Sequence, residues 1–283
     1  MFGRHRLDVK TPDQIRKMRV AGLVVGETLA LLRAKTSAGM TTGALDQAAE
    51  DFIRSNGATP SFLGYHGFTG SLCVSVNEEV VHGVPGSRIL REGDLVSIDC
   101  GAIVDGWHGD AAISLIVGGR DAGSARDLAL MDATEASMWS GIVALAVGSP
   151  LYDVGAAVED CIVEAARAGG VTYGIVEEYV GHGIGTEMHQ EPQVPNYRVR
   201  DRGPIVRSGL TVAIEPMVTS GSAETDVLDD DWTVVTQDGS RAAHWENSVA
   251  VTDAGIWVLT ALDGGQERLR TMGAQYAPLN GTS

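Results

Sequence analysis

Cysteine, basic residues and long hydrophobic runs are all scarce in this sequence, and each shortage excludes a class of protein. The three cysteines, Cys73, Cys100 and Cys161, lie far apart without any C-x-x-C spacing, which argues against a disulfide framework and against a thiolate zinc site. Lys and Arg number 21 against 37 Asp and Glu residues, a net charge of -16. This balance argues against a broad DNA or RNA surface and against binding to anionic membranes.

The sequence also lacks the hydrophobic segments of membrane and exported proteins. No apolar run reaches the about 18 residues of a membrane span, and the N-terminal residues contain no apolar signal segment. We therefore expect a soluble cytoplasmic protein with buried, reduced cysteines. Hydrophobic residues make up 44% of the 283 residues, enough for a sizeable core, and the 36 glycines follow no collagen-like period.

Helical and strand patterns follow one another in two similar rounds. The first round has predicted helices at 11–32 and 43–55 and predicted strands at 72–76, 80–81, 95–103 and 108–117. The second has predicted helices at 124–147 and 151–168 and predicted strands near 178 and at 210–218, 233–236 and 245–251. The order predicts two α/β halves whose sheets join around a central site.

Sliding the sequence along itself supports an internal repeat. At offsets of 109 and 116 the matched pairs include Gly39–Gly148, His66–His182, Ile98–Ile214 and Asp99–Glu215. We predict one pseudo-symmetric domain at 11–260, with halves of about 11–120 and 121–260, and tails at 1–10 and 261–283.

Two aspartates lie on a predicted hairpin. If Asp105 and Gly106 form a two-residue turn, position 99 faces position 112, which puts Asp110 diagonal to Asp99 on the same sheet face. The neighbouring residues are apolar, and buried like charges are too costly without a cation or a shared proton. The alternative is two solvated aspartates at strand ends. The repeat argues against that alternative, because it places Glu215 at the position equivalent to Asp99.

Three histidines and one more glutamate have distinctive settings. His182 lies within G-H-G-I-G, where glycines leave the imidazole accessible, although an incidental histidine in a flexible loop is the alternative. His189 follows seven residues later, and His82 follows an apolar strand. Glu246 is flanked by apolar residues, with an exposed strand-end glutamate as its alternative.

The remaining histidines and the acidic run have plainer settings. His5, His108 and His244 are interpreted as ordinary polar residues, and His66 as a residue that lines the site. The acidic run at 224–231 lacks hydrophobic framing and is predicted to be a solvated loop.

These residues together resemble the type I methionine aminopeptidases. The resemblance covers about residues 11–259 and rests on five residues in the order and framing of that family's metal ligands: Asp99, Asp110, His182, Glu215 and Glu246. The segment at 64–85 also looks like the type I enzymes, and the 32 residues between the third and fourth of these leave no room for the helical insertion of type II enzymes. The resemblance implies an α+β pita-bread fold in a short bacterial form, with a curved antiparallel sheet and helices outside.

The resemblance also implies roles for individual residues. Asp99 would bind one divalent metal ion, His182 and Glu215 would bind a second, and Asp110 and Glu246 would bridge the two. It assigns proton acceptance to Glu215, stabilisation of the tetrahedral intermediate to His189, and contact with the scissile nitrogen or leaving amine to His82. The residues expected around the methionine side chain are Tyr65, Phe68, Cys73, Met188 and Trp232. Such a mixed oxygen and nitrogen site accepts Co, Mn, Fe, Zn, Ni or Mg, and the sequence does not choose among them.

Some positions depart from the family pattern. Asn247 follows Glu246 where histidine is common, Gly101 replaces a frequent threonine, and Phe62 and Met188 replace frequent cysteine and phenylalanine. None of these changes removes an expected ligand. They are expected to alter metal affinity and the shape of the pocket.

The implied function is removal of the initiator methionine from nascent polypeptides with a small second residue. We expect a monomer whose contact with the ribosome, if made, is transient, through a basic patch among Arg4, Arg6, Lys10, Arg16 and Lys17. A proline-directed peptidase of the same fold is a second reading, weakened because only 98 residues precede Asp99. A non-catalytic module that binds protein or RNA is a third, although such modules characteristically lose ligands.

Overall fold

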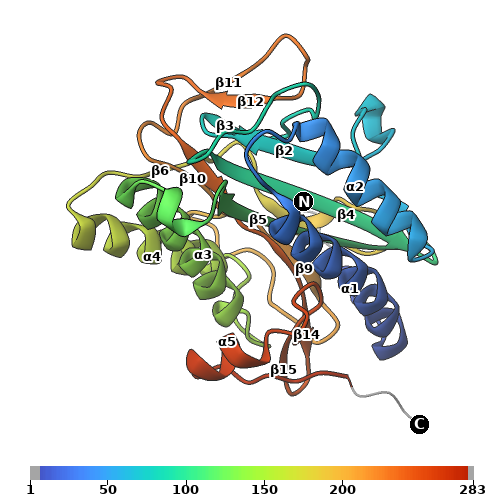
Figure 1. Cartoon of the computed structure of the whole chain (residues 1–283). Coiled ribbons are helices and arrows are strands. Elements are labelled where there is room, and N and C mark those ends of the chain that lie inside the picture. The colour runs from blue at the N-terminus through green and yellow to red at the C-terminus, as the bar shows by residue number, and fades with distance from the viewer. Residues whose placement is uncertain (1–6, 280–283) are drawn as a thin grey trace.

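Two helices and an antiparallel sheet form the first half of the fold (Figure 1). In the computed structural model, which describes residues 7–279, α1 (Pro12–Lys35) and α2 (Thr42–Ser55) pack on this sheet, α1 mainly against β4 (Leu95–Val104) and β5 (Trp107–Ile116). The predicted capping box of α1 is confirmed, since the Gln14 backbone N–H donates to the Thr11 hydroxyl and the Thr11 N–H donates to the Gln14 side chain. β4 pairs with β5 along one edge and with β2 (Leu72–Val76) and β1 (Thr59–Pro60) along the other.

The predicted hairpin between β4 and β5 is confirmed in its register. Val104 pairs with Trp107 and Asp99 pairs with Ala112, so Asp110 is opposite Gly101 and diagonal to Asp99. The turn residues Asp105 and Gly106 both have positive φ, 49° and 77°, as a two-residue turn between twisted strands requires.

The second half repeats this plan with different connections. Helices α3 (Ala125–Ala144) and α4 (Asp153–Gly169) pack on each other, and α3 also packs on strands of the neighbouring sheets. One sheet has the order β15 (Gly255–Val258), β14 (Asn247–Thr252), β9 (Thr211–Ile214), β7 (Gly181–Gly183), β8 (Gln190–Val194). Another has the order β13 (Ala242–His244), β10 (Met217–Thr219), β6 (Gly174–Ile175). Figure 1 shows the two helix pairs side by side over the strands.

The strand predicted at 210–218 is broken in the middle. It forms β9 and β10, which are separated by Glu215 and Pro216, and proline interrupts the ladder because it has no N–H to donate. Ile214 pairs with Asn247 and Met217 pairs with His244 in one continuous register, so Glu215 falls opposite Glu246. The interruption places two carboxylates face to face between paired strand segments.

The central strands of the two halves have similar neighbours, whereas one histidine pair matched by the sequence offset lies in different elements. β4 and β9 are each flanked by a hairpin partner and by an earlier strand, and Gly39 and Gly148 end equivalent segments with φ of 90° and 91°. The predicted pairing of His66 with His182 is wrong. His66 lies in a 3-10 turn ahead of β2, whereas His182 lies within β7, because the connections of the two halves differ in length.

A small fourth sheet closes one end of the molecule. Its order is β11 (Thr225–Val227), β12 (Val234–Thr236), β3 (Glu79–Val81). The strand predicted near 178 does not form, and β6 and β7 lie on either side of that position instead. β11 and β12 lengthen the connection between β10 and β13, so the second hairpin is longer than the β4–β5 hairpin.

Both chain ends that were predicted to be tails belong to the packed fold where the structure describes them. Beyond residue 260, α5 (Gln266–Thr271) buries Leu269 completely in the core beneath α3 and α4. At the other end the Lys10 side chain is 3% exposed, and its ammonium bonds Asp8 and Gln190. An apolar contact and an ion pair between the buried Lys10 and the exposed Asp8 hold these segments against the fold. No helix among residues 7–279 is long and apolar enough to cross a membrane.

Candidate active site

A cavity of about 700 Å³ is lined by residues of both halves of the fold. β4 and β5 contribute Asp99 and Asp110, β7 contributes His182, and Glu215 and Glu246 come from the links between β9 and β10 and between β13 and β14. Further lining residues include Phe62, Tyr65, His66, Phe68, Cys73, His82, Tyr179, Met188, His189 and Trp232. The structure therefore brings all five predicted ligands to one cavity, together with every predicted substrate-contacting residue.

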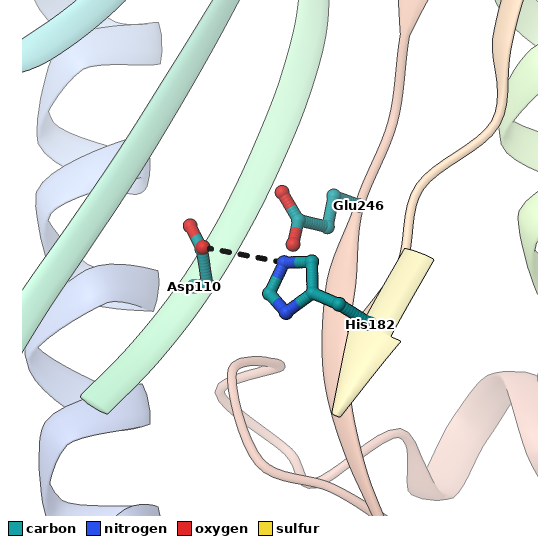
Figure 2. A group of neighbouring side chains, drawn as sticks. All are labelled: Asp110, His182 and Glu246. Atoms are coloured by element: carbon teal, nitrogen blue, oxygen red, sulfur yellow. Dashed lines mark ion pairs between the residues drawn. The ribbon is translucent and has the colours of Figure 1, made fainter. Parts of the chain in front are cut away.

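Figure 2 shows Asp110 of β5, His182 of β7 and Glu246, which lies between β13 and β14, pointing toward one another. One ligand atom from each lies within 4.8 Å of the other two. His182 Nε2 is 3.5 Å from Glu215 Oε1 and 4.0 Å from Asp110 Oδ2. These separations exceed hydrogen bonds but suit atoms that share a cation, since two ligands each about 2.1 Å from one ion lie about 3 to 4 Å apart.

The orientation of the His182 ring is set by its own backbone. Its Nδ1 lies 3.0 Å from the Gly183 carbonyl oxygen, which can only accept, so Nδ1 carries the proton. Nε2 is then left with a lone pair directed at the carboxylates. Burial lowers the pKa of His182 to about 4, with His189 as a further cause, so the ring is neutral at pH 7.

Four carboxyl groups share this buried space. Burial raises the pKa of Asp99 to about 7 and raises the pKa of Asp110 well above its ordinary value, with the charges of Asp99 and Glu215 adding to the second shift. Burial also raises the pKa values of Glu215 and Glu246, and neighbouring carboxylates raise both further. So much negative charge at low solvent exposure needs protons or cations to offset it.

Unpartnered oxygens show that the site fits metal ions. Within residues 7–279, Asp99 Oδ1, Asp110 Oδ1 and Glu246 Oε1 are buried without a hydrogen-bond partner. Buried acceptors are normally satisfied, and carboxylate oxygens with one imidazole are donors that divalent transition metals accept. The donor set therefore fits divalent cations.

His244 belongs to this neighbourhood, and interpreting it as an ordinary polar residue was wrong. It is 1% exposed, its Nε2 lies 3.8 Å from Glu215 Oε2, and it forms a second potential ligand group with Glu215 and Glu246. Burial lowers its pKa to about 3, with His82 as a lesser cause. Strand alternation could have identified His244, because side chains two residues apart in an extended chain lie on the same face, and Glu246 follows His244 by two residues.

The two other predicted catalytic histidines lie along the cavity wall. His189 stacks edge-on against His182 with ring centres 4.4 Å apart, and its Nδ1 lies 2.8 Å from the Tyr65 hydroxyl. His82 has a positive φ of 58° and packs edge-on against Tyr179. Burial lowers the pKa of His82 to about 4 and also lowers the pKa of His189, so neutral rings face the cavity at pH 7.

An apolar pocket forms another part of the wall. Phe62, Phe68, Cys73 and Met188 are buried against one another, with Tyr65, Val84 and Trp232 packed around them. Phe68 and Trp232 meet edge-to-face with ring centres 5.0 Å apart. This pocket contains all five side chains predicted to surround an apolar substrate group.

The other sequence predictions have mixed outcomes. The acidic run at 224–231 is largely exposed, as predicted, but Thr225–Val227 form strand β11, so the prediction of a loop is wrong there. The predicted basic patch is wrong at Lys10, which is buried and forms an ion pair with the exposed Asp8, and Arg16 forms an ion pair with Asp13. His5, Arg4 and Arg6 lie outside the described residues.

Comparison with known proteins gives consistent results. The sequence model of metallopeptidase family M24 matches residues 16–253. The chain is 50% identical over 259 residues to methionine aminopeptidase 1 of Mycobacterium tuberculosis, covering 91% of this chain and 96% of that protein. The crystal structure of methionine aminopeptidase from Rickettsia prowazekii superposes with a TM-score of 0.84 at 34% identity, over 90% of this chain and all of that one. Prolidase from Pyrococcus furiosus shares the fold, with a TM-score of 0.69 at 18% identity, over 89% of this chain and 65% of that one.

Proposed function

Because this chain belongs to metallopeptidase family M24, we propose that it is a methionine aminopeptidase, which removes the initiator methionine from nascent polypeptides with a small second residue. One observation carries the proposal: three buried carboxyl groups, the largely buried carboxyl group of Glu215 and a neutral imidazole meet at a cavity whose adjoining wall is an apolar pocket. Cation-binding groups beside an apolar pocket suit hydrolysis next to an apolar first residue. The relatives named methionine aminopeptidase support the same activity.

Five side chains would hold two divalent ions. Asp99 would bind one and His182 with Glu215 the other, while Asp110 and Glu246 would bridge them. When bound, the ions would lower the pKa of a water molecule and offset negative charge on the scissile carbonyl. Co, Mn, Fe, Zn or Ni suits this donor set.

The chain's own groups would position and transfer protons. Glu215 Oε1 faces the centre of the site beside His182, where the carboxylate can accept a proton from the attacking water. His189 faces the same space and would donate a hydrogen bond to the oxygen of the tetrahedral intermediate. His82, neutral at pH 7, would contact the scissile nitrogen or the leaving amine.

The apolar pocket would select the first residue. Tyr65, Phe68, Cys73, Met188 and Trp232 surround a space suited to an unbranched thioether side chain. Aromatic rings and sulfur make favourable contacts with methionine. We also propose that the protein acts in the cytoplasm as a monomer with at most transient contact with ribosomes, in keeping with its net charge of -16.

A proline-directed peptidase is the competing enzyme of the same fold. Its resemblance rests on 18% identity, which concerns the fold alone, and this chain covers 65% of the prolidase. Retention of all the carboxylates in one cavity speaks against a non-catalytic module.

Peptide turnover across metals tests the proposal. Protein stripped with EDTA and reloaded in turn with Co²⁺, Mn²⁺, Fe²⁺, Zn²⁺ and Ni²⁺ should release methionine from Met-Ala-Ser and leave an Ala-Pro peptide intact. Asp110→Asn and His182→Ala should abolish turnover. Asp229→Asn, which changes an exposed aspartate of the acidic run, is the matched control and should retain it. Preferential cleavage of Ala-Pro, or full activity in Asp110→Asn, would overturn the proposal.

A further inference from the structure

The Glu215 carboxylate lies between two imidazoles. Its Oε1 is 3.5 Å from Nε2 of His182, and its Oε2 is 3.8 Å from Nε2 of His244. His182 lines the cavity, whereas His244 is 1% exposed and lies behind Glu215, outside the cavity lining. The two histidines therefore approach the carboxylate from different sides, one from the cavity and one from the protein interior.

The backbone of His244 is firmly held. Its N–H lies 3.0 Å from the Ser114 hydroxyl and 3.2 Å from that of Ser97, and the Ser114 hydroxyl donates to its carbonyl at 2.9 Å. β13 continues this anchoring by pairing His244 with Met217 of β10. The ring is thus carried by a rigid strand, as precise placement of a neighbouring group requires.

The side chain of His244 has an unused polar atom. Nε2 is buried and without a hydrogen-bond partner within residues 7–279. A lone pair directed at a carboxylate oxygen would be repelled, so the tautomer with the proton on Nε2 is favoured. The N–H then points toward Glu215 Oε2, the oxygen that His182 does not face.

We propose that His244 is a positioning residue that orients Glu215 through Oε2, so that Oε1 is directed into the cavity. The inference rests on the proposed metal centre, in which Glu215 is a ligand and a proton acceptor. Ligand carboxylates are commonly oriented by a second donor, and loss of such a donor costs about 10- to 100-fold in metal affinity. Direct ligation by His244 is the competing role, but an ion would have to pass Glu215 to reach a ring that does not line the cavity.

Two replacements of His244 distinguish a role as a hydrogen-bond donor from a role in packing alone. His244→Gln keeps an N–H donor, whereas His244→Leu fills similar volume without one. We expect Co²⁺ affinity by calorimetry to fall about 10- to 100-fold in His244→Leu and to stay within about threefold of the original in His244→Gln. Thr134→Val is the control for loss of a buried polar group, because the Thr134 hydroxyl donates within α3 to the Leu130 carbonyl, and it should keep the original affinity.

Proton NMR of the Co²⁺-loaded full chain supplies a measurement that a change in packing alone would not alter. Each ligating imidazole gives its own strongly shifted ring signals, so the proposal expects one set, lost in His182→Gln and kept in both His244 variants. A second set that disappears in the His244 variants would show direct ligation and overturn the proposal. Original affinity in His244→Leu, or equal loss in His244→Gln, would also overturn it. Failure of the unaltered chain to bind Co²⁺ would instead remove the proposed metal centre itself, and this inference with it.

Discussion

The Tyr65 hydroxyl lies 2.8 Å from Nδ1 of His189 at the cavity wall. Burial raises the pKa of Tyr65, with Glu187 and Asp110 as further causes, so the phenol keeps its proton and can donate it to Nδ1. That hydrogen bond would place the His189 proton on Nε2. Tyr65 would therefore set the tautomer in which His189 can donate to an oxyanion.

Tyr65→Phe should lower kcat for Met-Ala-Ser about tenfold with little change in KM, the size expected for one lost hydrogen bond of about 1.4 kcal/mol. His189→Ala should lower kcat more, about 10²- to 10³-fold, because it removes the donor itself. In the His189→Ala background the Tyr65→Phe change should have almost no further effect on kcat. Additive losses in the double variant would show that Tyr65 acts independently of His189.

The buried carboxyls make the metal-free protein sensitive to alkaline pH. A carboxyl whose pKa is raised by folding stabilises the fold below its unfolded pKa of about 4, and this contribution is lost as pH rises through the folded pKa. The folded pKa is about 7 for Asp99 and is raised well above the ordinary value for Asp110, Glu215 and Glu246. Above pH 7, deprotonation therefore places uncompensated charge in the cavity.

Buried histidines make the stability of the fold depend on pH in the acidic range. The pKa is lowered to about 4 in His82 and His182 and to about 3 in His244. Their contribution is present above the unfolded pKa of about 6.5 and is lost as pH falls. Between pH 7 and 9 these rings are almost wholly neutral in both states, so that window reports mainly the carboxyls, and the buried thiols of Cys73 and Cys100, whose pKa values burial also raises, contribute only near pH 9.

We expect the melting temperature of EDTA-stripped protein to fall by on the order of 5 °C between pH 7 and 9. Loading with Co²⁺ or Mn²⁺ should abolish most of this fall, because cations replace the protons. Asp99→Asn should reduce the fall in the stripped protein. Calorimetric melting curves would provide the test, and a stripped protein equally stable at both pH values would contradict the buried-charge account.

Much of the site could be predicted because it depends on short-range pattern. The β4–β5 register follows from a turn with two positive-φ residues, and it fixes Asp110 relative to Asp99. The strand repeat likewise matched Asp99 with Glu215. Neighbours in a hairpin are set by the sequence between them, which is why these relationships were accessible without a structure.

The internal repeat could not reveal His244, whose only signal in the sequence is its spacing of two residues from Glu246. β11 and β12 lengthen the second hairpin. The sequence offset that matches β4 with β9 therefore no longer applies at β13. The break at Glu215 and Pro216 was missed as well, because the apolar pattern at 210–218 continues across a proline that cannot donate to the ladder. The burial of Leu269 in the core depends on packing between distant segments.

The position of His182 depends on a glycine beside it. A Cβ at Gly181 would lie 2.4 Å from the Ala213 carbonyl oxygen, so β7 would have to move away from β9. Gly181→Ala should destabilise the protein by about 1 to 3 kcal/mol and weaken Co²⁺ binding, as urea unfolding and calorimetry would show. At Gly86 an added Cβ would meet no atom of the described chain within 4 Å, so Gly86→Ala should change stability by less than about 0.5 kcal/mol. Equal behaviour of the two variants would contradict close packing at β7.

The width of the apolar pocket should decide which first residue is accepted. Phe68 is 3% exposed and packs against Trp232 in the wall of the pocket. Phe68→Leu would therefore shorten this part of the wall and keep it apolar. A methylene in such a pocket is worth about 1 to 3 kcal/mol of discrimination. The ratio of kcat/KM for Met-Ala-Ser over the ethionine peptide, which is longer by one methylene, should therefore fall about tenfold in Phe68→Leu. Phe52→Leu makes the same change on α2, outside the cavity lining, and should leave the ratio unaltered. An unchanged ratio in Phe68→Leu would mean that the first residue binds elsewhere in the cavity.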